Sequence, residues 1–213
     1  MIERTVITTS DGLALEAERA TPEGAPRAAM VLCHPHPQHG GTMRSIVIGA
    51  LFEALPKVGV TCLRFNFRGV EGSEGTYGHG HAEQHDAQAA VSLLAADLAT
   101  AGVDVPLILA GWSFGGDVTL TTVDDAITAW LAIAPPLRIL PDFSAVAHDP
   151  RPKLLALAEH DEFREPSSVI EEVAGWTATR TQLVPGASHF FVGRTDRLVE
   201  IAAGYVDEVI SRS

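Results

Sequence analysis

Cysteine and basic residues are scarce in this sequence, and each shortage excludes a class of protein. Cys33 and Cys62 are the two cysteines in 213 residues, and both lie in apolar runs. A disulfide-rich scaffold is excluded, and buried free thiols in a reducing compartment are the simpler interpretation. The chain has 15 lysines and arginines against 27 acidic residues, a formal net charge of −12. Since no basic run occurs either, a nucleic-acid partner or an anionic membrane surface is not expected.

Long apolar stretches are also missing. No run has the length that crosses a bilayer, and the opening residues 1–4 contain no apolar segment of a signal peptide. The sequence therefore predicts a cytoplasmic protein with no membrane partner. A hydrophobic content of 46% with 20% charged residues is typical of a globular chain. The length of 213 residues suits a single domain over 1–213 with a full hydrophobic core.

Short apolar runs alternate with helical patterns along the chain. An opening hairpin is expected over 4–9 and 13–19. Further strands are expected at 28–33, 60–67, 105–110, 127–134, 153–158 and 179–184. Helices are expected at 43–58, 83–100, 114–125, 166–175 and 195–211. This order predicts an α/β fold with a mostly parallel, doubly wound sheet and an antiparallel N-terminal edge, whose functional groups gather at the carboxyl ends of the strands.

The most informative motif lies between the expected strand 105–110 and the helix that follows it. Gly111, Ser113 and Gly115 form Gly-x-Ser-x-Gly. In this strand-to-helix turn, glycines permit a strained backbone and the serine hydroxyl is held above the sheet. A free serine hydroxyl is a poor nucleophile, so Ser113 needs a histidine base and an acid. The motif predicts nucleophilic catalysis if both partners follow it in the chain.

A base and an acid do follow, in the expected order. His189 comes shortly after the last expected strand, and Asp161 comes after the strand before that one. Asp161 is the preferred acid, which would hold the His189 imidazole in one tautomer and stabilise the imidazolium. Glu159 and Glu162 remain alternatives, because a slip of one or two residues would exchange them with Asp161.

Backbone N–H groups are needed to bind the oxyanion that forms when serine attacks a carbonyl group. Phe114, directly after the nucleophile, is expected to supply one of them. The second is expected from the loop 34–41, whose prolines have no N–H, so His36 is preferred and Gln38 or a glycine is the alternative. Trp112, on the other side of the serine, is expected to bind substrate, with core packing as the alternative.

These stretches together resemble the α/β-hydrolase superfamily, nearest a compact bacterial group related to dienelactone hydrolases. The resemblance is carried by the loop 34–43, by the segment 63–69 with residues 72–75, by the Gly-x-Ser-x-Gly turn and by the block around His189. These stretches span nearly the whole chain. The resemblance implies an eight-stranded sheet and a Ser-His-Asp hydrolase that uses neither a metal nor an organic cofactor.

Two positions depart from the pattern of that group. Dienelactone hydrolases use a cysteine nucleophile where this chain has Ser113, so the resemblance does not carry their substrate over. The loop that starts at Arg68 has Glu71 where the family usually has a second glycine. The conformation of this loop is therefore left open by the resemblance.

Two other clusters allow a different interpretation. The histidines of the segment 34–39 form His-x-His-x-x-His, which resembles part of a dinuclear metal motif. The aspartate of that motif is missing, so packing and backbone roles are favoured over a metal site. Arg64 and Arg68, with Glu83 and Asp86, would either bind an acidic substrate or, as is more usual, form ion pairs that tie a loop to a helix.

The sequence therefore predicts a serine hydrolase that cleaves small carboxylic esters through an acyl-enzyme, with a small-molecule ester as its partner. The segment between the strands 127–134 and 153–158 is short, which excludes a large lid and favours soluble esters over aggregated lipid. The alternatives are a thioesterase, an acyltransferase or a peptidase with the same three residues, a non-catalytic binder, and metal-assisted hydrolysis at the histidine-rich loop. The oligomeric state is left open, a homo-oligomer included.

Overall fold

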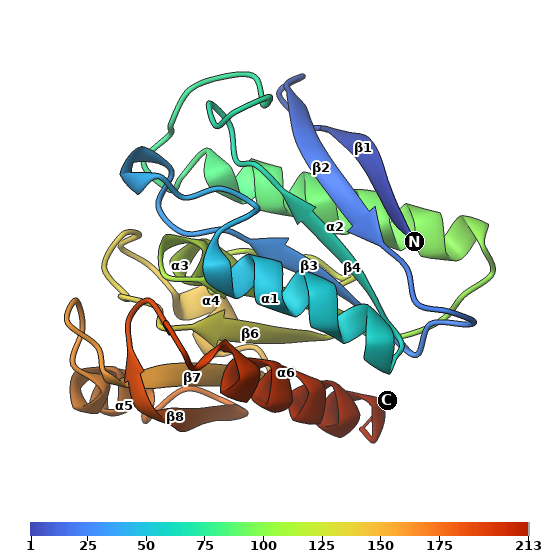
Figure 1. Cartoon of the computed structure of the whole chain (residues 1–213). Helices are drawn as coiled ribbons and strands as arrows, with labels where there is room; N and C mark the ends of the chain where they lie inside the picture. The colour runs from blue at the N-terminus through green and yellow to red at the C-terminus, as the bar shows by residue number, and fades with distance from the viewer. Residues whose placement is uncertain (213) are drawn as a thin grey trace.

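Eight strands pair into one mixed sheet in the computed structural model, which describes residues 1–212 (Figure 1). In chain order they are β1 (Ile2–Thr8), β2 (Ala14–Ala20), β3 (Ala28–Cys33), β4 (Val60–Phe65), β5 (Leu107–Trp112), β6 (Ala129–Ile133), β7 (Lys153–His160) and β8 (Thr179–Ser188). Their order across the sheet is β1-β2-β4-β3-β5-β6-β7-β8. β2 runs antiparallel to both of its neighbours, and the remaining pairs are parallel. The predicted α/β fold class with an antiparallel N-terminal edge is confirmed.

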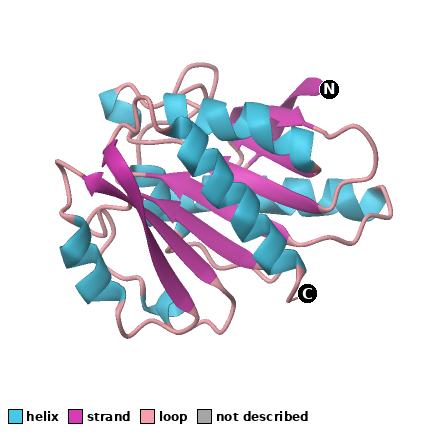
Figure 2. Ribbon diagram, turned by 60° about the horizontal axis from the view of Figure 1, so that its bottom comes forward, coloured by secondary structure: helices cyan, strands magenta, loops and turns pink. Residues whose placement is uncertain are grey.

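Helices cover both faces of this sheet. α1 (Ile46–Ala54) and α6 (Thr195–Ile210) pack on one face, and Figure 2 shows α6 lying across it. The other face carries α2 (Glu83–Thr100), α3 (Phe114–Thr119), α4 (Ser144–Ala147) and α5 (Pro166–Val173). Two short 3-10 helices, η1 (Pro37–His39) and η2 (Leu55–Val58), flank α1. Within residues 1–212, no helix combines the length and the apolar character that a bilayer crossing requires.

The two layers of helices explain the continuous apolar runs of the central strands. Every residue of β3 is buried, with Met30 in the core under α1 and α6 and Val31 in the core on the opposite face. A strand covered on both faces needs apolar side chains at consecutive positions. Cys33 and Cys62 lie in opposite cores and are free, as predicted, and burial raises the pKa of the Cys33 thiol to about 12.

Several elements end at positions other than those predicted. α3 ends at Thr119 rather than at 125. Beyond it, the Thr122 hydroxyl donates to the Val118 carbonyl at 2.8 Å, and this side-chain bond competes with a further helical turn. β7 and β8 are longer than predicted, since they continue past an irregularity to the pair His160 and Ser188. This extension carries the residues that follow both strands to one point above the sheet.

The two ends of the described chain lie at the edge of the sheet opposite the carboxyl ends of its parallel strands (Figure 1). β1 pairs antiparallel with β2, and β2 pairs antiparallel with β4, so β1 runs in the same direction as β4. β1 therefore starts at the same edge of the sheet as the central strands. After β8 the chain returns along α6 to that same edge (Figure 1). The loops at the carboxyl edge are therefore remote from both ends.

Candidate active site

The Gly-x-Ser-x-Gly motif forms a sharp turn between β5 and α3. Ser113 has φ 55° and ψ −119°, a conformation that costs a non-glycine residue about 1–3 kcal/mol. A Cβ atom on Gly111 would lie 2.1 Å from the carbonyl oxygen of Gly115, and a Cβ on Gly115 would lie 2.4 Å from that of Cys33. Glycine is required at both positions because the start of α3 packs directly on the backbone of β3 and β5. The turn holds Ser113 at the carboxyl edge of the sheet.

Three side chains from separate segments meet at this edge. The Oγ atom of Ser113 lies 2.9 Å from Nε2 of His189, and Nδ1 of His189 lies 2.8 Å from Oδ2 of Asp161. An ionised carboxylate only accepts hydrogen bonds, so Nδ1–H donates to Asp161 and Nε2 is left to accept from the Ser113 hydroxyl. The structure thus brings together the residues that the sequence singled out as nucleophile, base and acid.

Asp161 is fixed by further hydrogen bonds. Its Oδ1 atom accepts the backbone N–H of Phe163 at 2.9 Å and that of Arg164 at 3.1 Å. Burial alone would raise the pKa of Asp161, but the hydrogen bond and charge of His189, together with these N–H donors, hold the pKa below its usual range. Asp161 is therefore ionised at neutral pH, as an acceptor for His189 must be.

The two alternative acids bond to the backbone instead. Glu162 accepts the N–H of His189 at 2.9 Å, and Glu159 accepts the N–H of Gly186 at 2.7 Å. Glu162 therefore holds the backbone of His189 and Glu159 holds the end of β8 just before it, whereas Asp161 contacts the imidazole ring itself. This division of contacts favours Asp161 as the acid.

The N–H groups expected to bind an oxyanion belong to residues that line the same cavity as Ser113. Phe114 is the first residue of α3, so its N–H has no acceptor within the helix. In the loop after β3, Gln38 donates its N–H to Nδ1 of His36 at 3.2 Å, and Gly41 donates to the His36 carbonyl at 3.1 Å. Gln38 and Gly41 are therefore engaged elsewhere, so His36 stays the preferred second donor, with Gly40, which also lines the cavity, as the remaining alternative.

His34 has a structural role in this loop. Its Nε2 accepts the N–H of Phe67 at 3.0 Å, and its Nδ1–H donates to the Pro35 carbonyl at 2.6 Å. Neither ring nitrogen is left to ligate a metal, so the loop histidines do not form the site that the alternative hypothesis requires. Within residues 1–212, no group of three His, Cys, Asp or Glu side chains is arranged to hold a metal ion.

We expect the His34 imidazole to stay neutral until about pH 4. Burial lowers its pKa to about 4, against 6.5 for an exposed histidine. Because the folded state holds the neutral ring, this residue contributes stability that is present above pH 6.5 and is lost as the pH falls towards 4, about 3 kcal/mol in total. An NMR titration of the ring resonances measures the pKa directly, and protonation of His34 near pH 6.5 would contradict the prediction.

The ring titration is the sharper measurement because Asp117 changes stability in the opposite sense over the same pH range. Burial raises the pKa of this carboxyl from 3.8 to about 6. Its contribution to stability therefore rises as the pH falls from 6 towards 3.8. Unfolding curves of the wild-type protein report the sum over all groups whose pKa changes on folding, these two included, whereas the ring resonances report His34 alone.

A cavity of about 680 Å³ opens above Ser113. Most of its lining is apolar or aromatic, from Ile46, Trp112, Phe114, Pro136, Ile139, Phe163 and Phe190. Trp112 lines it as predicted, and its indole N–H also donates to the His189 carbonyl at 3.1 Å, which ties the loop of His189 to β5. Direct contact between Trp112 and a substrate stays a prediction.

Sequence reasoning missed several residues of this cavity. Phe163 and Phe190 stand two residues after Asp161 and one after His189, so their position beside these candidates was a usable signal. Phe163 packs against the imidazole with ring centroids 4.6 Å apart. Arg138 and Ile139 come from the segment after β6, where the sequence has no motif. Their place in the cavity follows from the fold alone.

The arginines considered as an acid-binding site are engaged in ion pairs. Arg68 lies 2.7 Å from Asp86 on α2 and 2.8 Å from Asp11, and Arg64 lies 2.6 Å from Glu18 on β2. The interpretation in which an arginine ties a loop to a helix therefore holds for Arg68. An acid-binding role for this pair of arginines is not supported.

The loop with Glu71 adopts a conformation that normally favours glycine. Glu71 has φ 47°. Its carboxylate accepts hydrogen bonds from Arg44 at 2.9 Å and from the Asn66 side chain at 2.8 Å. These bonds offset the backbone strain, so a left-handed turn persists here without the glycine that the sequence resemblance leads us to expect.

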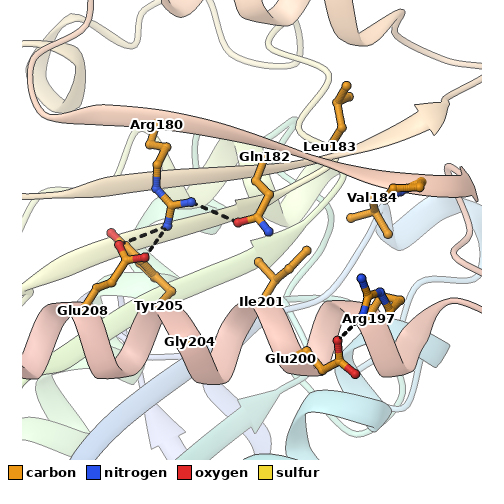
Figure 3. Close-up of a pocket in the computed structure, with 11 residues that line it drawn as sticks. Arg180, Gln182, Leu183, Val184, Arg197, Glu200, Ile201, Gly204, Tyr205 and Glu208 are labelled. Atoms are coloured by element: carbon orange, nitrogen blue, oxygen red, sulfur yellow. Dashed lines mark hydrogen bonds and ion pairs between the residues drawn. The ribbon is translucent and has the colours of Figure 1, made fainter.

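A second cavity, of about 380 Å³, lies between β8 and α6 (Figure 3). Its charged side chains pair with one another, since Arg180 lies 2.8 Å from Glu208 and Arg197 pairs with Glu200 (Figure 3). None of Ser113, His189 and Asp161 lines it. This cavity therefore has no part in the candidate active site.

Comparison with known proteins places this geometry in a family. No family profile matches the chain. An uncharacterised protein of Rickettsia prowazekii is 32% identical over 198 residues, which cover 88% of this chain and 81% of that protein. An α/β serine hydrolase homologue from Coxiella burnetii is 30% identical, with a TM-score of 0.81 over 95% of this chain and 96% of its own. A serine hydrolase without a lid from Xanthomonas campestris is 28% identical, with a TM-score of 0.83 over 99% and 94% of the two chains.

The chain belongs to the α/β-hydrolase superfamily. The sheet order, the turn at Ser113 and the similar solved structures all agree on this. The relatives support a hydrolase, and the nearer relation to dienelactone hydrolases stays a prediction.

Proposed function

We propose that this protein is a serine hydrolase that cleaves small carboxylic esters through an acyl-enzyme. The observation that carries the proposal is the continuous hydrogen-bonded chain from Ser113 through His189 to Asp161, of which Ser113 and His189 line an open cavity. The roles that this chain suits are nucleophile, general base and orienting acid.

The geometry supports the following sequence of steps. Ser113 Oγ attacks the ester carbonyl while Nε2 of His189 takes its proton, and Asp161 stabilises the resulting imidazolium. The N–H groups of Phe114 and His36 bind the negative oxygen of the tetrahedral intermediate. His189 then returns the proton to the departing alcohol oxygen, which leaves the acyl group on Ser113. A water molecule repeats the attack, releases the acid and restores the serine.

The open cavity supports small or soluble substrates. The segment between β6 and β7 contains only the four-residue helix α4 within the described chain. It is too short to form a lid domain over Ser113. The similar structure from Xanthomonas campestris is likewise described as a hydrolase without a lid. We therefore favour soluble esters over aggregated lipid as substrates.

Mass spectrometry after treatment with a fluorophosphonate probe tests this proposal. We expect one adduct on the folded protein, located on Ser113, and none on protein unfolded before treatment, because only the folded site activates the hydroxyl. Labelling in excess chelator should proceed at the same rate, since the proposed chemistry uses no metal. Absence of an adduct on folded protein would overturn the proposal.

A separate assay with an ester substrate distinguishes hydrolysis from transfer. Transfer of the acyl group to an added alcohol or thiol in place of water would identify an acyltransferase.

A further inference from the structure

One permanent charge lines the cavity above Ser113. Within residues 1–212, Arg138 is the sole Lys, Arg, Asp or Glu that lines this cavity, and its side chain is exposed. Arg64, Arg68 and Arg151 are each paired with a carboxylate, whereas no ion pair of Arg138 occurs within residues 1–212. An exposed and unpaired guanidinium on a residue that lines a cavity is available to a ligand.

The backbone that carries Arg138 is held in place by Asp117. The buried carboxylate of Asp117 accepts the N–H groups of Leu137 at 2.8 Å, Arg138 at 3.0 Å and Ile139 at 2.9 Å. Leu137 has φ 51°, a conformation that persists because these bonds fix the turn. Asp117 stands on α3 four residues after Ser113. One short helix therefore sets both the nucleophile and the turn that bears the charge.

The carboxylates around the cavity are already engaged. Asp161 binds His189, Glu162 binds the backbone N–H of His189, and Asp117 binds the turn beneath Arg138. None of these three carboxylates forms an ion pair with the Arg138 guanidinium. In a chain of net charge −12, an anionic substrate is repelled at long range, so its recognition depends on a local unpaired cation such as this one.

We propose that Arg138 is a specificity-determining residue that binds an anionic oxygen group of the substrate, so that the preferred ester also carries a free carboxylate. The inference rests on the proposed esterase function and names its substrate class. A guanidinium presents a planar fork of N–H donors that matches a carboxylate. The aromatic side chains Phe163 and Phe190 offer apolar contact to the rest of the molecule.

Matched pairs of esters test this proposal. In the first pair the free carboxylate lies on the acyl part of the ester: 4-nitrophenyl hydrogen glutarate is compared with its neutral carboxamide analogue. In the second the alcohol part differs, as 4-carboxyphenyl acetate against 4-carbamoylphenyl acetate. For at least one pair, we expect kcat/KM of the wild-type protein to favour the acid by about tenfold, and this preference to fall in 0.5 M salt.

Three substitutions assign the preference to Arg138. In Arg138→Gln, the ratio of kcat/KM for the acid to that for its neutral analogue should fall to about one. Arg138→Lys should keep part of the preference because the charge remains. Arg197→Gln makes the same change of net charge on the exposed surface of α6 and should keep the wild-type preference. The inference fails if the wild-type protein prefers the acid in neither pair, or if Arg138→Gln lowers kcat/KM equally for the acid and for its neutral analogue. Absence of turnover together with absence of a Ser113 adduct would instead reject the esterase function itself.

Discussion

Replacing Ser113 with alanine is expected to lower kcat/KM for short carboxylic esters by about 10⁶-fold, to the level set by the remaining binding and oxyanion contacts. The reason is that the 2.9 Å contact with His189 activates this hydroxyl, and no second serine hydroxyl bonds to that imidazole within residues 1–212. Initial rates with short 4-nitrophenyl esters measure the loss. Retention of more than about one hundredth of the activity would contradict a nucleophilic role.

Ser113→Gly provides the matched control for folding. Both variants remove the hydroxyl, but glycine tolerates φ 55° whereas alanine keeps the strain of the turn. We therefore expect the glycine variant to be equally inactive and to unfold at higher denaturant concentration than the alanine variant, by about 1 kcal/mol in free energy of unfolding. If the glycine variant is as inactive as the alanine variant but more stable, the loss of activity comes from the missing hydroxyl and not from a weakened fold.

Replacing Asp161 with asparagine is expected to lower kcat by about 10⁴-fold with little change in fold. An amide in place of the carboxylate no longer fixes the proton on Nδ1 of His189 and does not stabilise the imidazolium. The backbone N–H groups of Phe163 and Arg164 still have an amide oxygen to bind, which keeps the loop in place. Steady-state kinetics with the same esters, together with circular dichroism, measure both parts of the prediction.

Glu159→Gln and Glu162→Gln are the controls for this assignment. Glu162 accepts the backbone N–H of His189 and Glu159 that of Gly186 near the end of β8, and a glutamine side-chain oxygen can accept the same bonds. We expect each substitution to lower kcat less than about tenfold. The hydrogen bond to the backbone N–H is kept, although it is weaker because glutamine is neutral and the carboxylate that it replaces is charged. A 10⁴-fold loss in Glu162→Gln with a small loss in Asp161→Asn would transfer the role of the acid to Glu162.

The elements that the sequence predicted well are those whose apolar pattern is decided by burial. β3 and β6 are buried along their whole length, and their continuous runs of apolar residues predict this burial. The order of nucleophile, acid and base along the chain was also readable, because each follows a strand and the carboxyl ends of parallel strands share one edge. His189 accordingly lies within hydrogen-bond distance of both Ser113 and Asp161.

Other features depend on contacts between segments that no local pattern records. Asp117 reads as an ordinary helical aspartate, and its partners at 137–139 lie about 20 residues further along the chain. Arg138 stands in a segment without regular structure, so its place in the lining of the cavity above Ser113 follows only from the path of the chain after β6. The length of α3 was overestimated because hydroxyl groups such as that of Thr122 bond to carbonyls a helical turn earlier.

The position of the two chain ends has a practical consequence for attaching the protein to other molecules. Both ends of the described chain, residues 1 and 212, lie at the edge of the sheet opposite the loops that carry Ser113 and His189 (Figure 1). A fusion partner or a solid support joined at either end would therefore extend away from the opening of the cavity. Immobilised protein should present that opening to solution in either orientation, and its access to bulky soluble reagents should match that of the free protein.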